Sequence, residues 1–132
     1  MEKERDHPMS KSAVWPRVAG AAMMLLVALK PVAAADAEHG KQLYLACSAC
    51  HTGRPDAVGP NLKGVFGRKS GSLDGYRYSG PMQRANLIWD DANLREYIAN
   101  PQAKVKGNRM PYAGLKDPAE IDDLIAYLKV LN

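Results

Sequence analysis

CSACHTG, the stretch from Cys47 to Gly53, holds both cysteines of this 132-residue chain and one of its three histidines. The two thiols stand three positions apart, so one helical turn brings them to the same side of the backbone. His51 follows directly after the second thiol. This concentration of metal-binding and redox-active side chains raises the question of which chemistry the stretch serves.

Three interpretations compete: a dithiol redox pair, half of a zinc site, or an attachment point for a c-type haem. A zinc site needs about four ligands, but the chain has no further cysteine, and His7 and His39 stand isolated. A redox pair is expected beside a βαβ pattern, which this sequence does not show. In a C-x-x-C-H motif the thiols bind the haem covalently and the histidine is an axial iron ligand. The motif alone leaves the choice open.

The first 35 residues have the pattern of a secretory signal peptide. Four basic residues precede a 12-residue apolar run, Val18 to Leu29, and small residues follow it. Twelve residues are too few for a membrane span of ~20. We expect cleavage after Ala35, with Ala37 as second choice. The mature domain, 36–132, would then be periplasmic and would keep no stable membrane anchor.

The composition of residues 36–132 fits one small exported domain. It carries 13 Lys and Arg against 11 Asp and Glu, a balance that gives no reason to expect nucleic acid binding. In an oxidising compartment two neighbouring thiols are expected to be bonded or blocked. A domain of ~97 residues is also small for a core made of side chains alone. A large apolar cofactor would meet both requirements.

Hydrophobic periodicity predicts an all-α domain with two long irregular segments. The helices are expected at about 37–50, at 91–100, and from 118 onwards. Asp90 and Asp117 are the expected N-caps of the second and third helices. The irregular segments are 52–89, which is rich in Gly and Pro, and 102–116. A structureless segment as long as the first is unusual in a small domain, but it is expected if the loop wraps a cofactor.

A low-spin haem that transfers electrons needs a sixth iron ligand, and the candidates are Met82, Met110 and His39. Met110 lies in a polar loop bounded by Gly107 and Gly114, where a methionine is poorly placed to fill a core. Pro111 favours an extended backbone at Met110. Met110 is therefore the preferred candidate.

Five blocks resemble, in order and in spacing, those of the class I cytochromes c of the mitochondrial and bacterial c2-like kind. They are GKQLYLACSACH, VGPNLKGVFGRKSG, LIWDDANLREYIANP, KGNRMPYAGL and IDDLIAYLK. The resemblance implies the all-α cytochrome c fold, with three main helices and long loops wrapped round one covalently attached haem c. It also implies a periplasmic carrier, not an enzyme, that shuttles one electron by Fe(III)/Fe(II) cycling.

Carried over position by position, the resemblance assigns the central ligands. Cys47 and Cys50 would form the thioethers, and His51 and Met110 would take the axial positions as metal ligands. The carbonyl of Pro60 would accept a hydrogen bond from the His51 ring, which fixes the ring and raises its donor strength.

The resemblance also implies supporting roles around the haem. Arg68, Tyr78 and Trp89 match residues on the propionate side, and Tyr97 matches a tyrosine near the methionine sulfur. The packing of the first helix on the last is matched by Gly40, Tyr44 and Tyr127. The sequence departs from the mitochondrial pattern at Asn108 and Arg109, where Thr and Lys are usual.

The resemblance implies redox proteins as partners, one that donates the electron and one that accepts it. Membrane complexes and a periplasmic dehydrogenase are the candidates for these roles. We expect a monomer that does not bind nucleic acid. Two alternatives stand beside the free carrier. One is a haem subunit dedicated to a periplasmic dehydrogenase, and the other is a five-coordinate haem sensor or peroxidase.

Overall fold

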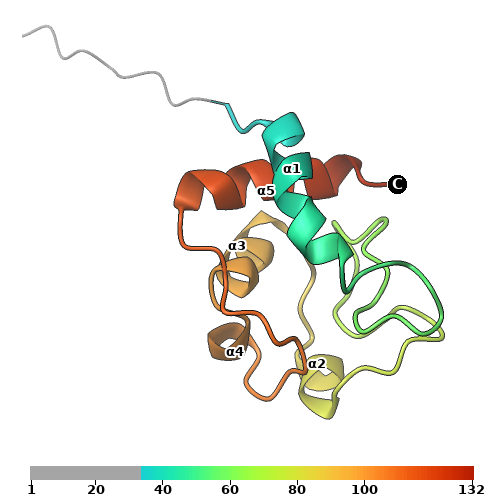
Figure 1. Ribbon diagram of the computed structural model, residues 1–132. Coiled ribbons are helices and arrows are strands. Elements are labelled where there is room, and N and C mark those ends of the chain that lie inside the picture. The colour runs from blue at the N-terminus through green and yellow to red at the C-terminus, as the bar shows by residue number, and fades with distance from the viewer. Residues whose placement is uncertain (1–33) are drawn as a thin grey trace, which may run out of the picture. The chain divides into compact units, whose positions relative to one another are not determined.

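A computed structural model describes residues 34–132, so nearly all of the expected signal peptide lies outside the described part. Five helices follow one another along the described chain: α1 (Ala37–Ser48), α2 (Gly80–Arg84), α3 (Asp91–Ala99), α4 (Pro101–Lys104) and α5 (Pro118–Val130). Figure 1 shows α1 crossing α5, with the long loops leaving the end of α1. The only strand-like pairing among the described residues is an isolated bridge between Lys69 and Ile88. The predicted all-α class is confirmed.

The three predicted helices form close to their expected positions. Helix α1 ends at Ser48, two residues before the expected end. Asp90 caps α3, where its carboxylate accepts a hydrogen bond from the Asn93 backbone N–H at 2.8 Å. Asp117 caps α5 by accepting from the Ala119 N–H at 2.9 Å. Both N-cap predictions are therefore confirmed.

The prediction that 52–89 and 102–116 are wholly irregular is wrong, because α2 lies in the first segment and α4 begins just before the second. The Ser79 hydroxyl caps α2 by accepting from the Met82 N–H at 3.2 Å. The Asn100 side chain caps α4 by accepting from the Ala103 N–H at 3.1 Å. Each helix has a proline in its first turn, where the missing N–H costs nothing. Helices of four or five residues are too short to show hydrophobic periodicity.

Helices α1 and α5 pack closely because Gly40 has no side chain. A Cβ atom at Gly40 would lie 1.9 Å from the backbone oxygen of Asp123. One turn further along, the rings of Tyr44 and Tyr127 lie 5.2 Å apart and are tilted by 55°. The expected packing of the first helix against the last is confirmed, and it holds α1, which carries Cys47 in its last turn and is followed by Cys50.

The core lies between α5, α3 and the loops. One face of α5 is buried, with Ile121, Leu124, Ile125 and Leu128 each 5% exposed or less. Leu94 and Ile98 of α3 pack into the same cluster. Between residues 34 and 132, no helix is both long enough and apolar enough to cross a membrane.

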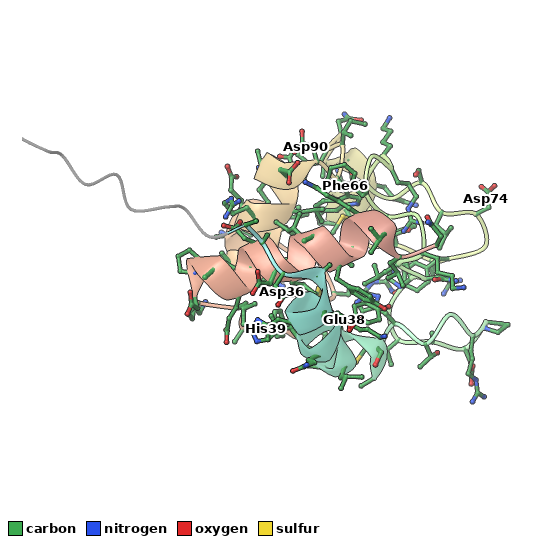
Figure 2. All side chains as sticks on the ribbon, turned by 90° about the horizontal axis from the view of Figure 1, so that it is seen from above. Asp36, Glu38, His39, Phe66, Asp74 and Asp90 are labelled. Carbon is green, nitrogen blue, oxygen red and sulfur yellow. The ribbon has the colours of Figure 1, made fainter. Side chains whose placement is uncertain are left out.

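A polar cluster joins the start of α1 to α5 on the outside of this crossing. Figure 2 shows Asp36, Glu38 and His39 grouped where α1 passes α5, far from the loop tip at Asp74. The His39 ring nitrogen Nδ1 lies 2.7 Å from the Asp123 carboxylate. This hydrogen bond raises the pKa of His39 and lowers the pKa of Asp123. The two helices are therefore coupled by a pH-dependent contact.

Replacing Gly40 by Ala should force α1 and α5 apart, because backbone atoms of α5 occupy the space of the new methyl group. We expect a loss of about 2–3 kcal/mol in the free energy of unfolding, measured by guanidinium titration of the holoprotein. Gly80→Ala is the matched control, since its methyl group would meet the flexible end of Arg84 instead of backbone. Equal stability of the two variants would contradict this account of the crossing.

Replacing His39 by Gln should destabilise the protein only at mildly acidic pH. Because the folded-state pKa of His39 is raised above its ordinary 6.5, the contribution of its charge is fully present below that value and fades as pH rises through the raised pKa. The Asp123 pKa is lowered from 3.8, so its contribution is present above that value and disappears only at more acidic pH. The difference in Tm from the parent should thus be largest near pH 5 and smallest above pH 8, and the opposite trend would refute the pairing.

Candidate functional site

One apolar cavity is lined by residues from the end of α1, from α5 and from the loops between them. Its empty volume is about 1110 Å³, including its open mouth. It is lined by all nine residues that the family resemblance places at the haem: Cys47, Cys50, His51, Pro60, Arg68, Tyr78, Trp89, Tyr97 and Met110. Leu124 and Leu128 of α5 contribute to the same wall. The long loops therefore enclose a common space, as the wrapping hypothesis predicted.

The two thiols and the imidazole reach the cavity from one turn at the end of α1. The backbone N–H groups of Cys50 and His51 both donate to the Cys47 carbonyl, at 3.1 Å and 3.0 Å. The two thiols are not joined in a disulfide. Burial raises the pKa of the Cys47 thiol. Both sulfur atoms are therefore positioned to bond to a group held inside the cavity.

The His51 ring is fixed by the backbone of the following loop. Its Nδ1 atom lies 2.6 Å from the Pro60 carbonyl oxygen, and because a carbonyl only accepts, Nδ1 must carry the proton. Burial lowers the pKa of His51, although the bond to Pro60 opposes that shift. Nε2 is thus left with a free lone pair, the form that binds a metal. A Cβ at Gly59 would lie 2.5 Å from the ring, so the loop approaches closely only because Gly59 is glycine.

Met110 is held by Asn108, a buried asparagine that the sequence marks only as a departure from the mitochondrial pattern. The Asn108 amide nitrogen donates to the carbonyls of Pro101 and Val105, at 2.9 Å and 2.8 Å. Its amide oxygen accepts from the Met110 N–H at 2.8 Å. Asn108 is 8% exposed, so it ties the methionine loop to α4 inside the protein. The sequence signal was an amide residue next to Gly107 in a turning loop.

The other two candidate ligands have different surroundings. Met82 was predicted to lie in a long loop, but it belongs to α2, is 8% exposed and lines the cavity. His39, at the start of α1, does not line the cavity, because its ring faces Asp123 of α5. The structure therefore separates His39 from the site and leaves two methionines beside it.

The loop after His51 is held by side chains that line the cavity. Arg68 donates to the backbone carbonyls of Asn61 and Lys63, at 2.9 Å and 3.1 Å. Tyr76, which sequence reasoning missed, donates its hydroxyl to the Val58 carbonyl at 2.6 Å. Its ring stacks edge-on against Tyr78, with 4.7 Å between centroids. These residues shape one wall of the cavity.

An aromatic pair forms another wall. The rings of Trp89 and Tyr97 lie 4.9 Å apart. Trp89 is 8% exposed, and burial raises the pKa of Tyr97 to about 12. The Tyr97 phenol therefore stays protonated across the physiological range and can act as a hydrogen-bond donor inside the cavity.

The residues of the cavity fit a haem by the chemistry of their donors. A neutral imidazole and a thioether are the axial ligands of c-type haem iron, and two free thiols stand beside the imidazole. The rest of the lining is largely apolar and aromatic, as a porphyrin face requires. His51, Met110, Cys47 and Cys50 all contact one space, so a single group could reach all four.

Comparison with known proteins also points to a haem protein. The family model for cytochrome c matches residues 37–132. The chain is 42% identical to a cytochrome c2 from Blastochloris viridis, over 83% of this chain and 88% of that protein. It is also 42% identical to a cytochrome c-550 from Nitrobacter winogradskyi, over 70% of this chain and 90% of that protein. Among solved structures, cytochrome cH from Methylobacterium extorquens superposes with a TM-score of 0.69 at 44% identity, covering 72% of this chain and 98% of that one.

Replacing Asn108 by Ala should loosen the methionine loop, because two carbonyls of the α4 region and the Met110 N–H would lose their buried partner. We expect a cost of about 1–3 kcal/mol in the free energy of unfolding, measured by denaturant titration of the holoprotein. Lys106→Ala, on an exposed neighbour, is the control and should change stability by less than about 0.5 kcal/mol. A similar loss in both variants would show that Asn108 has no special role.

Proposed function

This chain belongs to the cytochrome c family, and from that premise we propose which of its residues hold the cofactor and how they serve electron transfer. The protein is a single-haem electron carrier. It carries one covalently bound haem c. Its fold is the all-α cytochrome c fold, shared with the solved cytochrome cH.

In the proposal, Cys47 and Cys50 bind the haem through thioether bonds. His51 and Met110 would supply the two protein ligands of the haem iron. The observation that carries this assignment is that all four side chains line one apolar cavity. The protonation of His51 supports the assignment as well, since its imidazole has the proton on Nδ1 and a lone pair on Nε2 that can bind a metal.

The surrounding side chains would tune the bound group. Arg68, Tyr78 and Trp89 are proposed to lie on its propionate side, where their N–H and O–H groups are suited to carboxylates. Tyr97 is proposed to donate to the methionine sulfur, because its phenol stays protonated in the buried cavity. Two N–H groups of Arg68 already donate hydrogen bonds to backbone carbonyls, so part of its role is to hold the loop.

When bound, the haem supplies a one-electron Fe(III)/Fe(II) couple. The contribution of the chain is to keep the coordination unchanged while the electron passes. Pro60 holds His51 and Asn108 holds Met110, so neither ligand needs to move. The lining is largely apolar, and burial together with a thioether ligand raises the reduction potential. Burial lowers the pKa of His51, which favours the neutral imidazole that can bind a metal.

We infer that the protein works in the periplasm as a shuttle between a donor and an acceptor protein, without catalysing a reaction of its own. Support comes from the bacterial relatives named cytochrome c2 and cytochrome c-550. The pattern of residues 1–35 supports export. Exposed Arg109 lies beside Met110 at the cavity and offers a charge to a docking partner near the site of electron exit.

A pair of isosteric substitutions tests the proposed iron ligand. Met110→Leu keeps the volume but removes the sulfur, so the ferric protein should lose the weak far-red band of methionine-bound haem iron, bind CO readily and have a lower reduction potential. Met82→Leu should leave all three properties unchanged, because its methionine serves the core, where such a swap usually costs under about 1.5 kcal/mol. Loss of the band in Met82→Leu and its survival in Met110→Leu would overturn the assignment.

A further inference from the structure

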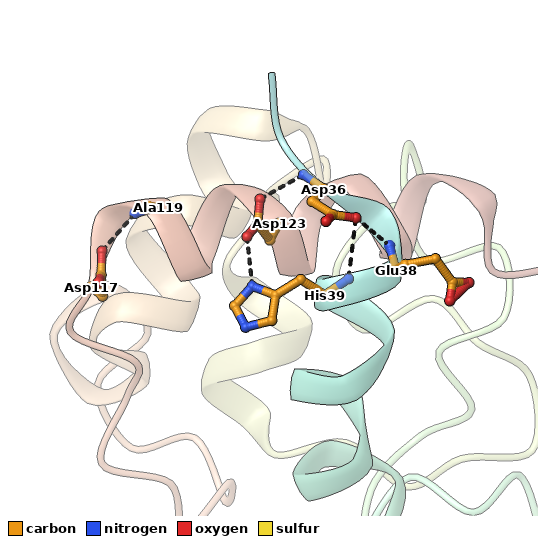
Figure 3. A network of polar contacts seen from close by, with 6 residues as sticks. All are labelled: Asp36, Glu38, His39, Asp117, Ala119 and Asp123. Atoms are coloured by element: carbon orange, nitrogen blue, oxygen red, sulfur yellow. Dashed lines mark hydrogen bonds and ion pairs between the residues drawn. The ribbon is translucent and has the colours of Figure 1, made fainter. Parts of the chain in front are cut away.

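The start of α1 is bound to α5 through a backbone nitrogen. The Asp36 nitrogen lies 2.6 Å from Oδ1 of Asp123, a residue 87 positions further along the chain. The other oxygen of the same carboxylate, Oδ2, lies 2.7 Å from the His39 ring. Figure 3 shows Asp123 between these two partners. One carboxylate on α5 thus receives both the beginning of α1 and its first-turn histidine.

Asp36 is also the residue that allows α1 to begin. Its carboxylate accepts from the N–H groups of Glu38 and His39, at 2.9 Å and 3.2 Å. Its carbonyl accepts from the Gly40 N–H at 2.9 Å. Ala35, immediately before it, is exposed and lies outside the helix. Among residues 34–132, Asp36 is therefore the first whose contacts tie the chain to the helices of the domain.

We propose that the peptide bond between Ala35 and Asp36 is a processing site, and that the α-ammonium group released there forms an ion pair with Asp123 that fastens α1 to α5. In the cleavage a leader-removing protease adds water across this bond. The carboxylate leaves with Ala35, and the amino group stays on Asp36 and takes up a proton. The neutral donor of the precursor thereby becomes a charged one facing the same oxygen.

The charges around the new terminus favour this state. The carboxylates of Asp36, Glu120 and Asp123 all act on the neighbouring His39 ring and raise its pKa, and His39 shares Asp123 with the Asp36 nitrogen. The first turn of α1 also carries Glu38 and Lys41, whose opposite charges are paired with each other. The Asp123 side chain is only 17% exposed, so its pairing is less screened than that of a fully exposed group. Three carboxylates against one imidazole leave room for an additional positive charge.

The contacts also distinguish between the two candidate cleavage points in the sequence. Cleavage after Ala37 would remove Asp36, and with it the N-cap of α1 and the bond to Asp123. Cleavage one residue earlier than Ala35 would move the positive charge one residue away from the carboxylate. Only a chain that begins at Asp36 keeps the cap and places its terminal charge on α5.

The first experiment identifies the terminus and titrates it. Intact mass of the exported holoprotein should correspond to a chain that begins at Asp36. NMR titration of its terminal amine should give a pKa above the ordinary range of about 7.7–8.0. A mass that begins elsewhere overturns the processing site, and a pKa within or below that range overturns the ion pair.

The second experiment separates the terminal charge from the hydrogen bond. Holoproteins that begin at Asp36 and at Ala35 are compared by thermal unfolding at low salt, each with and without Asp123→Asn. The Asp36 start should have the higher Tm, and the difference should vanish with Asp123→Asn. Equal Tm values, or a difference that survives the substitution, refute the pairing. Should the Asp123→Asn chain fail to fold, the amine titration of the unaltered protein still decides the question.

Discussion

One shared cavity is the constraint on which the fold depends. Residues from the end of α1, from the loops, from α3 and from α5 all face it. A domain of ~97 residues buries too little surface to be strongly stabilised by side chains alone. The haem gives these segments a common apolar partner, and because it binds the folded chain, binding adds directly to stability. Fold and cofactor are therefore coupled in this protein.

The sequence could specify the helices that have a periodic apolar face and a charged cap. Asp90 and Asp117 mark the starts of α3 and α5 because Asp is a preferred N-cap residue and each is followed by a periodic apolar face. Helices α2 and α4 escaped prediction, since five and four residues present no period. Their signals were local ones, a Ser before Gly-Pro and an Asn before Pro, which are equally common in turns.

Some residues of the site could likewise be predicted from the sequence, and others could not. The C-x-x-C-H spacing and the family resemblance brought together residues that do line one cavity, from Cys47 to Met110. Asn108 could not be recognised, because its role depends on where the carbonyls of Pro101 and Val105 come to lie in space. Tyr76 was missed for the same reason, as its partner Val58 is 18 positions away. Residues that position others are recognised only once the places of their partners in space are known, whether those partners are near in the sequence, as for Asn108, or distant, as for Tyr76.

The crossing of α1 and α5 places the two ends of the domain in contact, and this has a kinetic consequence. The Asp36–Asp123 bond spans 87 positions, so the chain must close a loop of nearly the whole length of the 36–132 domain before the two helices meet. Such non-local pairing is slow compared with the formation of single helices. Until α5 arrives, the cavity lacks the wall that Leu124 and Leu128 provide. Docking of α5 and enclosure of the haem are therefore coupled, because a chain in which α5 has not docked has an incomplete cavity.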